Sequence, residues 1–379
     1  MNIILMLVGV LLVYGILQYI YKRKWAENLS VDVGFTSDHA VPGDIIYLKE
    51  TVVNNKRLPL PYIYIKFQLS KNFKIMEKDG NSRVSDQTYR NDVFSLLYYQ
   101  KITRRIPLIC KKRGVYDIKN AEIVFSGIFM NETMVKNSPV ESRIIVFPEV
   151  IDLTSLEVPF KNMIGIMERR KYLLEDRFTF RGIRGYDSYD SMKDINWKAS
   201  ARTGQLCVNE FNETASQKVT ILLNLEPEGM LKQDRLSEES ISIAAGMAQM
   251  LIERGIEVSL ISNGCDIFCG EPVRIEYGSG NIHLNAINTA LATVDLSIDT
   301  PDFSEMLAVQ RDLDRIAANA KSVYVIISAN KRQNLVKAVA DLVENPAESM
   351  WIVPYHYGMD YKVADCSIPS LKWEVAYDN

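Results

Sequence analysis

The sequence predicts one membrane-spanning helix followed by an antiparallel β-sandwich and a doubly wound α/β domain. Three patterns along the 379 residues support this fold class. Residues 3–20 are almost uninterrupted aliphatic side chains, and residues 30–150 contain apolar runs that alternate with period two. In residues 214–379, short apolar strands alternate with amphipathic helices. The predicted domains are therefore an anchor (1–24), a β-sandwich (30–150), a charged linking segment (161–213) and an α/β domain (214–379).

The N-terminal run has the length of a membrane span. As a helix, residues 3–20 would rise about 27 Å, close to the thickness of the hydrocarbon core of a bilayer. A cleaved signal peptide would begin with basic residues, whereas the first charged residue here is Lys22. Because positive flanks stay in the cytoplasm, the triplet Lys22-Arg23-Lys24 predicts that the domains after the anchor are cytoplasmic.

Composition narrows the class of partner. The formal net charge is −3, which argues against nucleic acid because phosphate binding requires an excess of basic residues. Five scattered cysteines do not form a disulfide framework, which agrees with a reducing compartment. No cofactor motif and no small-molecule substrate are indicated.

The β-sandwich is predicted from at least five strands with polar turns between them. The strands are expected around residues 46–52, 63–69, 106–110, 121–125 and 143–147. A basic cluster accompanies the third strand; it consists of Lys101, Arg104, Arg105, Lys111, Lys112 and Arg113. Two interpretations stay open for this cluster, a solvated strand face and a surface for anionic lipid headgroups.

The charged segment interleaves opposite charges with glycines and one tryptophan. Ser191 and Asp194 have the spacing of a capping box, so a short helix is expected to begin there, and Gly204 is placed to end it. Residues 205–211 are expected to be extended. We predict a network of ion pairs around a buried Trp197, serving as a clamp between domains or as a surface that a partner recognises. The candidate residues are Arg181, Arg184, Tyr186, Asp187, Asp190, Lys193, Asp194, Trp197, Lys198 and Arg202.

The α/β domain is predicted from alternating elements. Strands are expected at residues 219–225, 257–262, 322–328 and 350–353, the last of which ends the series. Helices are expected from a cap at Ser237 to Gly255, around residues 284–291, over 306–316 and over 331–343. The loop after the first strand lacks the glycines that cradle phosphate, so nucleotide binding is not expected.

These residues resemble a bacterial family known as the domain of unknown function number fifty-eight. The matching signature consists of Arg184, Tyr186, Asp190, Lys193, Ile195, Trp197, Lys198, Ala199, Ser200, Ala201 and Arg202. Residues 55–61 and 112–116 also resemble the family. The sequence departs from the family at three positions. Tyr186 stands one residue later than the family's spacing, Tyr189 replaces a glycine, and Lys193 replaces an arginine. Lysine cannot form the bidentate fork of arginine.

The resemblance carries its own expectations about fold and partners. It implies a C-terminal domain similar to the von Willebrand factor A type. It also implies association with a MoxR-type AAA+ ATPase and with a transglutaminase-like membrane protein. The metal motif of that fold, Asp-x-Ser-x-Ser, corresponds here to Asn224, Glu226 and Glu228. Because Asn and Glu replace the usual ligands, no metal is expected, and Glu226 and Glu228 are only weak candidates.

The function predicted from the sequence is therefore a membrane-anchored, non-enzymatic adaptor or scaffold in a cell-envelope process. Two alternatives stay open. A hydrolase would need His283 or His356 beside a serine and a carboxylate. A metal-dependent adhesion module would need a cation held at Glu226 and Glu228.

Overall fold

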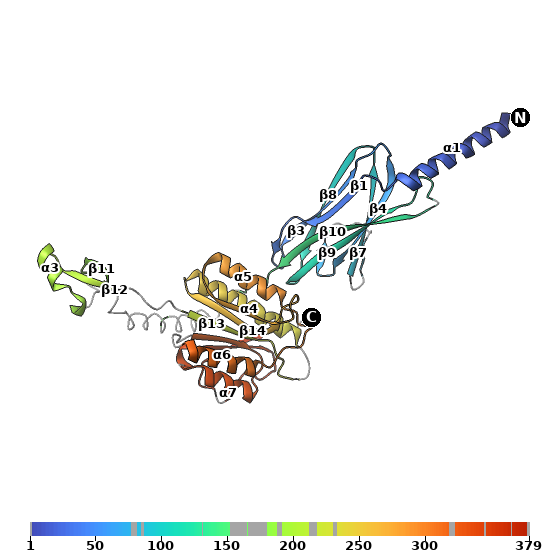
Figure 1. Ribbon diagram of the computed structural model, residues 1–379. Helices are drawn as coiled ribbons and strands as arrows, with labels where there is room; N and C mark the ends of the chain where they lie inside the picture. The colour runs from blue at the N-terminus through green and yellow to red at the C-terminus, as the bar shows by residue number, and fades with distance from the viewer. Residues whose placement is uncertain are drawn as a thin grey trace. The chain divides into compact units, whose positions relative to one another are not determined.

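The apolar N-terminal run forms a single helix, α1 (Asn2–Lys24), that is long and apolar enough to cross a membrane. The computed structural model describes residues 2–76, 82–84, 87–130, 132–151, 165, 180–187, 192–211, 218–229, 233–317, 323–344, 346–364 and 366–376. The chain divides into two units, Met1–Glu149 and Val150–Asn379 (Figure 1). The first unit contains α1 and the β-sandwich, and the second contains the remaining elements.

Two sheets form the β-sandwich, and their inner faces share one hydrophobic core. The first sheet has the order β1 (Leu29–Phe35), β3 (Ile45–Asn54), β8 (Gln100–Cys110), β5 (Phe73–Ile75). The second has the order β2 (His39–Ala40), β10 (Met134–Val146), β9 (Gly114–Phe125), β4 (Leu60–Ser70), β7 (Gln87–Leu96), β6 (Ser82–Val84). Every pair is antiparallel except β2 with β10. The predicted antiparallel sandwich is confirmed.

The five predicted strands correspond to β3, β4, β8, β9 and β10, in which mostly apolar buried positions alternate with mostly polar exposed ones. In β4, for example, Ile63, Ile65 and Phe67 are buried while Lys66 and Gln68 are exposed. The sequence analysis missed β1, β2, β5, β6 and β7. Three of these are only two or three residues long, too short for an alternating pattern.

The charged segment forms a small folded element, which we call the signature module. An antiparallel pair, β11 (Phe180–Gly185) and β12 (Cys207–Phe211), is accompanied by the 3-10 helix η2 (Met192–Asp194) and by α3 (Trp197–Thr203). The helix begins later than predicted: its cap is Asn196, and Asp194 belongs to the preceding 3-10 turn. Ser191, the other half of the predicted capping box, lies outside the described residues. Gly204 ends α3 with φ 72°, as predicted.

A six-stranded sheet organises the α/β domain. Its order is β15 (Pro272–Gly278), β14 (Glu257–Cys265), β13 (Lys218–Asn224), β16 (Val323–Ser328), β17 (Met350–His356), β18 (Ser370–Val375). All neighbours are parallel except the edge strand β15. The order places the first strand in the middle, so helices cover both faces, as the doubly wound prediction requires. The sequence analysis missed β15 and β18, and its expectation that the series ends at Val353 is wrong.

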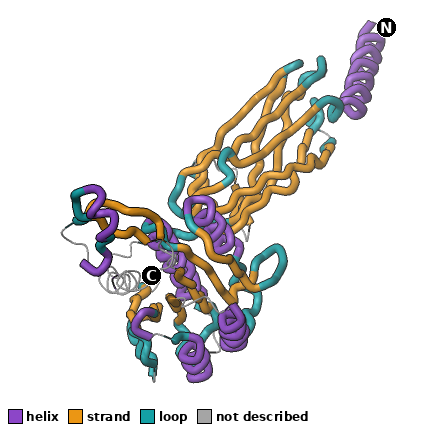
Figure 2. Tube along the Cα trace, turned by 60° about the vertical axis from the view of Figure 1, so that its left-hand side comes forward, coloured by secondary structure: helices purple, strands orange, loops and turns teal. Residues whose placement is uncertain are grey.

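Helices α4 (Asp234–Glu253) and α5 (Gly280–Thr293) pack with one face of the sheet, while α6 (Phe303–Ala317) and α7 (Gln333–Leu342) pack with the other. These helices are labelled in Figure 1, and Figure 2 gives a second view of the same elements. Alternate residues of β13 serve the two faces, since Ile221 belongs to the core with α4 and Leu222 to the core with α6 and α7. Helix α4 begins three residues before the predicted cap, Ser237. It ends at Glu253, and the predicted Gly255 follows two residues later with a left-handed φ of 74°.

Candidate functional site

The signature module is built around Asn196, the residue that caps α3. The Asn196 side-chain oxygen accepts from the Ala199 backbone N–H at 2.9 Å, and its amide donates to Asn209 Oδ1 at 2.7 Å. Ser200 adds a second link, because its hydroxyl accepts from the Cys207 N–H at 2.8 Å. Two polar side chains therefore fasten α3 to β12. The sequence analysis overlooked Asn196, although asparagine before a helical run is a cap signal.

Trp197 is 65% exposed, so the expectation of a buried ring is wrong for the described structure. Helix α3 has no buried side chain, and the small interior of the module consists of Ile195 and Val208. A single helix of seven residues beside a two-stranded sheet offers too little surface to cover an indole. Further exposed apolar side chains of the module are Ile183, Met192 and Leu206. The module thus presents an apolar surface outward.

The predicted charged residues have different positions in the module. Arg184, Asp187, Lys193, Lys198 and Arg202 are exposed. Arg184 donates to the Gly185 carbonyl at 3.1 Å, and Tyr186 is half-buried with its N–H on the Leu206 carbonyl. Asp190 and the side chains of Arg181 and Asp194 lie outside the described residues. Arg184, Asp187 and Lys193 each have interaction partners, while the full ion-pair network stays a prediction.

A second candidate lies at the carboxyl edge of the α/β sheet, where doubly wound folds bind ligands. A pocket of about 290 Å³ lies beside the loop that follows β13. At its base, Asn224 Oδ1 accepts from Asn263 Nδ2 and from the Glu226 N–H, both at 2.9 Å. Asn224 Nδ2 donates to Ser328 Oγ at 3.1 Å. The amide at the first position of the metal motif is therefore held on both atoms by protein groups.

Two basic side chains neutralise the glutamates of this edge pocket. Arg332 Nη1 lies 3.0 Å from Glu226 Oε1, and Lys331 Nζ lies 3.0 Å from Glu228 Oε2. Arg332 also donates twice to the Glu228 carbonyl, and Lys331 to the Asp360 carbonyl at 2.6 Å. Within the described ranges, no group of three or more His, Cys, Asp or Glu side chains is placed to hold a metal ion. The weak metal candidates, Glu226 and Glu228, therefore each form an ion pair with a basic side chain of the protein.

The three histidines are placed separately. His283 Nε2 lies 2.7 Å from the Val258 carbonyl, and buried His356 has Nδ1 2.9 Å from the Val375 carbonyl. His39 belongs to the sandwich and stacks on Phe147. Two of the three therefore contact strand backbone.

These features define a class: a chain with a membrane-length apolar helix, a β-sandwich and a doubly wound α/β domain with a charge-neutralised pocket. Residues 182–345 match the family model described as "Protein of unknown function DUF58". The matched region covers most of the signature module and most of the α/β domain, so it is this part of the chain that is similar to the family.

Solved structures give weaker similarities. A CARDB domain from Pyrococcus furiosus is 17% identical over 31% of this chain and 91% of that chain, with a TM-score of 0.22. A non-cellulosomal cohesin from Archaeoglobus fulgidus is 12% identical over 35% of this chain and 96% of that chain, with a TM-score of 0.23. Both TM-scores are below 0.5, so these two structures support no argument about this chain. The description of the β-sandwich rests on its own strand pairing. The comparison with curated proteins found no match.

Proposed function

We propose that the protein is a membrane-anchored, non-enzymatic adaptor or scaffold whose signature module binds another protein. The observation that carries this proposal is the exposed Trp197 on α3. Hydrogen bonds of Asn196 and Ser200 join α3 to β12, so the backbone that carries the Trp197 indole is held in place. Exposed tryptophan and arginine side chains on a preorganised surface are typical of binding hot spots.

Charges beside the indole favour the partner interpretation over an internal clamp. Lys198 and Arg202 lie on the same short helix as Trp197, and both are exposed. A clamp gains its strength from burial, because exposed ion pairs contribute little to stability. A partner that covers this surface would desolvate the indole and the neighbouring cations together.

The resemblance supplies the proposed partners, a MoxR-type AAA+ ATPase and a transglutaminase-like membrane protein. In this proposal α1 anchors the chain, the basic triplet after it keeps both units cytoplasmic, and the process concerns the cell envelope. The finer assignment of the α/β domain as von Willebrand factor A-like belongs to the same proposal. It is supported by the doubly wound sheet. Asn224 at the end of the first strand, with Glu226 and Glu228 after it, occupies the motif positions with different residue types.

The two alternatives are less well supported. A hydrolase would need a histidine beside a nucleophile, whereas His283 and His356 contact backbone carbonyls. A metal-dependent adhesion module would need free carboxylates, whereas Glu226 and Glu228 pair with Arg332 and Lys331.

A pull-down with Trp197→Ala tests the proposal. The full chain is captured from native membranes, with and without ATP, and co-purifying AAA+ ATPases are identified. We expect Trp197→Ala to lose the ATPase while its free energy of unfolding stays within about 0.5 kcal/mol of wild type, because the ring is exposed. Arg202→Ala should behave in the same way.

The matched control is Trp351→Ala, because that ring is fully buried. It should lower stability by about 3–5 kcal/mol, which shows that the assay detects a structural tryptophan. A large destabilisation by Trp197→Ala or Arg202→Ala would establish the clamp instead. Wild-type protein that never enriches an AAA+ ATPase would reject the proposed partner.

A further inference from the structure

We propose that the end of the β-sandwich next to α1 is a membrane-binding surface, with the tip of the loop between β9 and β10 inserted among the lipid acyl chains. This inference goes beyond the adaptor role and rests on its membrane anchor. The partner is the bilayer itself, and the surface is continuous with the proposed span. The tip consists of Phe129 and Met130, both exposed and apolar.

The loop runs along α1 instead of leaving it. The rings of Tyr14 and Phe129 have centroids 4.5 Å apart. Nearer the sandwich, Lys22 Nζ lies 3.2 Å from Glu132 Oε2, and the Tyr21 ring stacks on Phe125 at 5.8 Å. From Tyr14 to Lys22 a helix rises about 12 Å, so the loop follows α1 for more than two turns.

The position of Tyr14 on α1 then fixes the depth of the loop. Lys22, Arg23 and Lys24 form the last turn of α1 and would lie at the level of the headgroups if the helix spans the bilayer. Tyr14 precedes Lys22 by eight residues, which places it about 12 Å deeper and inside a hydrocarbon core about 30 Å thick. Phe129 packs against Tyr14, so the tip of the loop must lie inside as well. The order of residues agrees, since the charged pair Lys22–Glu132 lies at the base and the apolar tip lies deeper.

A neighbouring turn belongs to the same end of the sandwich. Between β7 and β8, Leu97, Tyr98 and Tyr99 are all exposed. The Tyr99 N–H donates to the Lys56 carbonyl at 3.1 Å, and Lys56 Nζ donates to the Trp25 carbonyl at 2.7 Å. The turn is thus joined to the end of α1. Tyrosine and tryptophan are enriched at the level of the headgroups, so this turn suits the interface.

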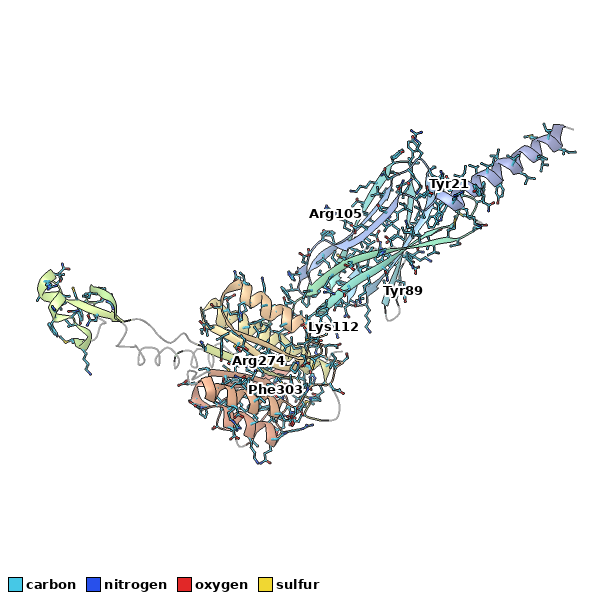
Figure 3. The ribbon with its side chains drawn as sticks, viewed as in Figure 1. Tyr21, Tyr89, Arg105, Lys112, Arg274 and Phe303 are labelled. Atoms are coloured by element: carbon cyan, nitrogen blue, oxygen red, sulfur yellow. The ribbon has the colours of Figure 1, made fainter. Side chains whose placement is uncertain are left out.

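Part of the basic cluster, Lys111–Arg113, lies away from the end of the sandwich that adjoins α1. Lys112 and Tyr21 lie at opposite ends of the sandwich (Figure 3). Strand β8 separates the Tyr99 turn from Lys111–Arg113 by about 36 Å, at 3.3 Å for each of its residues. The lipid surface proposed here is therefore aromatic and apolar, and the Lys111–Arg113 end of the basic cluster does not contribute to it.

Depth-dependent fluorescence quenching tests the inference. Full-length protein carries a fluorescent amino acid at position 129, in vesicles of phosphatidylcholine and phosphatidylglycerol with a nitroxide on the acyl chain. Tyr47 provides the matched control, because both side chains are 47% exposed and Tyr47 pairs with Pro107, far from α1. We expect fluorescence to be lost at position 129 and unchanged at position 47. The same label at Met130 gives an independent measurement.

Flotation of the vesicles separates the two possible failures. Protein that does not float with the vesicles lacks the anchor, which rejects both the anchor and this inference. Protein that floats while positions 129 and 130 remain unquenched keeps its anchor and overturns the inserted loop alone.

Discussion

A buried charge cluster crosses the interior of the β-sandwich. Asp92 pairs with Arg90 and with Arg104, whose Nη1 lies 3.0 Å from Asp92 Oδ1. Glu50, opposite Arg104 in the β3–β8 register, has no exposed surface. Burial, followed by the neighbouring Asp92 carboxyl, raises the pKa of Glu50 to about 9. At neutral pH Glu50 therefore keeps its proton, and the Asp92 carboxylate pairs with both Arg90 and Arg104.

The raised pKa of Glu50 predicts a pH-dependent stability. In the unfolded chain this carboxyl loses its proton near pH 4.3, whereas the folded chain retains it up to about pH 9. Stability should therefore fall as pH rises through that window, by at most about 1.4 kcal/mol per pH unit. Glu50→Gln stays neutral, so we expect it to be more stable than wild type at pH 8 and similar at pH 4. Chemical denaturation across this range measures the effect.

Glu122→Gln is the control for this prediction, because Glu122 is an exposed glutamate of β9 in the same sandwich. It should follow the wild-type curve. An equal slope for Glu50→Gln and wild type would mean that Glu50 ionises in the folded protein.

Single residues of the signature module show where sequence reasoning reaches its limit. The left-handed Gly204 was predictable because it depends only on local backbone conformation. The exposure of Trp197 was not, because a seven-residue helix of mixed polarity has no clear apolar face. Burial of that ring depends on how much surface packs against α3, which the order of residues does not state.

Elements were predictable where one face of a strand or helix is buried along its length. Strands β3, β4 and β13 and helix α4 have buried positions at the spacing that their apolar residues predict. The edge strands β15 and β18 have few buried positions and were missed. The position of each edge strand depends on hydrogen bonds to a neighbouring strand. Such pairing does not require alternating apolar residues, so the sequence of an edge strand shows little periodicity.

The loops at the carboxyl edge of the sheet provide a prediction about metal binding. Glu226, Glu228 and the Asp360 carbonyl offer oxygen atoms, which Lys331 and Arg332 now occupy. Wild-type protein should therefore give no heat with magnesium in titration calorimetry. The double variant Lys331→Ala, Arg332→Ala frees these oxygens and should bind magnesium weakly, because two carboxylates and one carbonyl are few ligands for a hard cation.

Adding Glu226→Gln and Glu228→Gln to the double variant is the control, and it should abolish the heat. Magnesium binding by the wild type at this edge would show instead that the two basic side chains yield to a cation, and it would favour the adhesion module.

At the scale of the whole molecule, the chain contains two units with separate hydrophobic interiors. The sandwich core consists of residues from the first unit, and both cores of the α/β sheet consist of residues from the second. The sequence analysis expected the β-sandwich and the α/β domain to be separate because the periodicity changes from two to a strand–helix alternation. Membrane orientation and the partner depend on other molecules, so they remain proposals.

Separate interiors predict two unfolding transitions. Leu48 lies in the sandwich core and Ile221 in the sheet core, and neither has exposed surface. Replacing either by alanine removes a buried side chain and should lower the stability of its own unit by about 2–5 kcal/mol. In calorimetry of the detergent-solubilised chain, we expect Leu48→Ala to shift one transition and Ile221→Ala to shift the other. A single transition that both variants shift equally would show that the units unfold as one cooperative body, because uncoupled domains do not share a destabilisation.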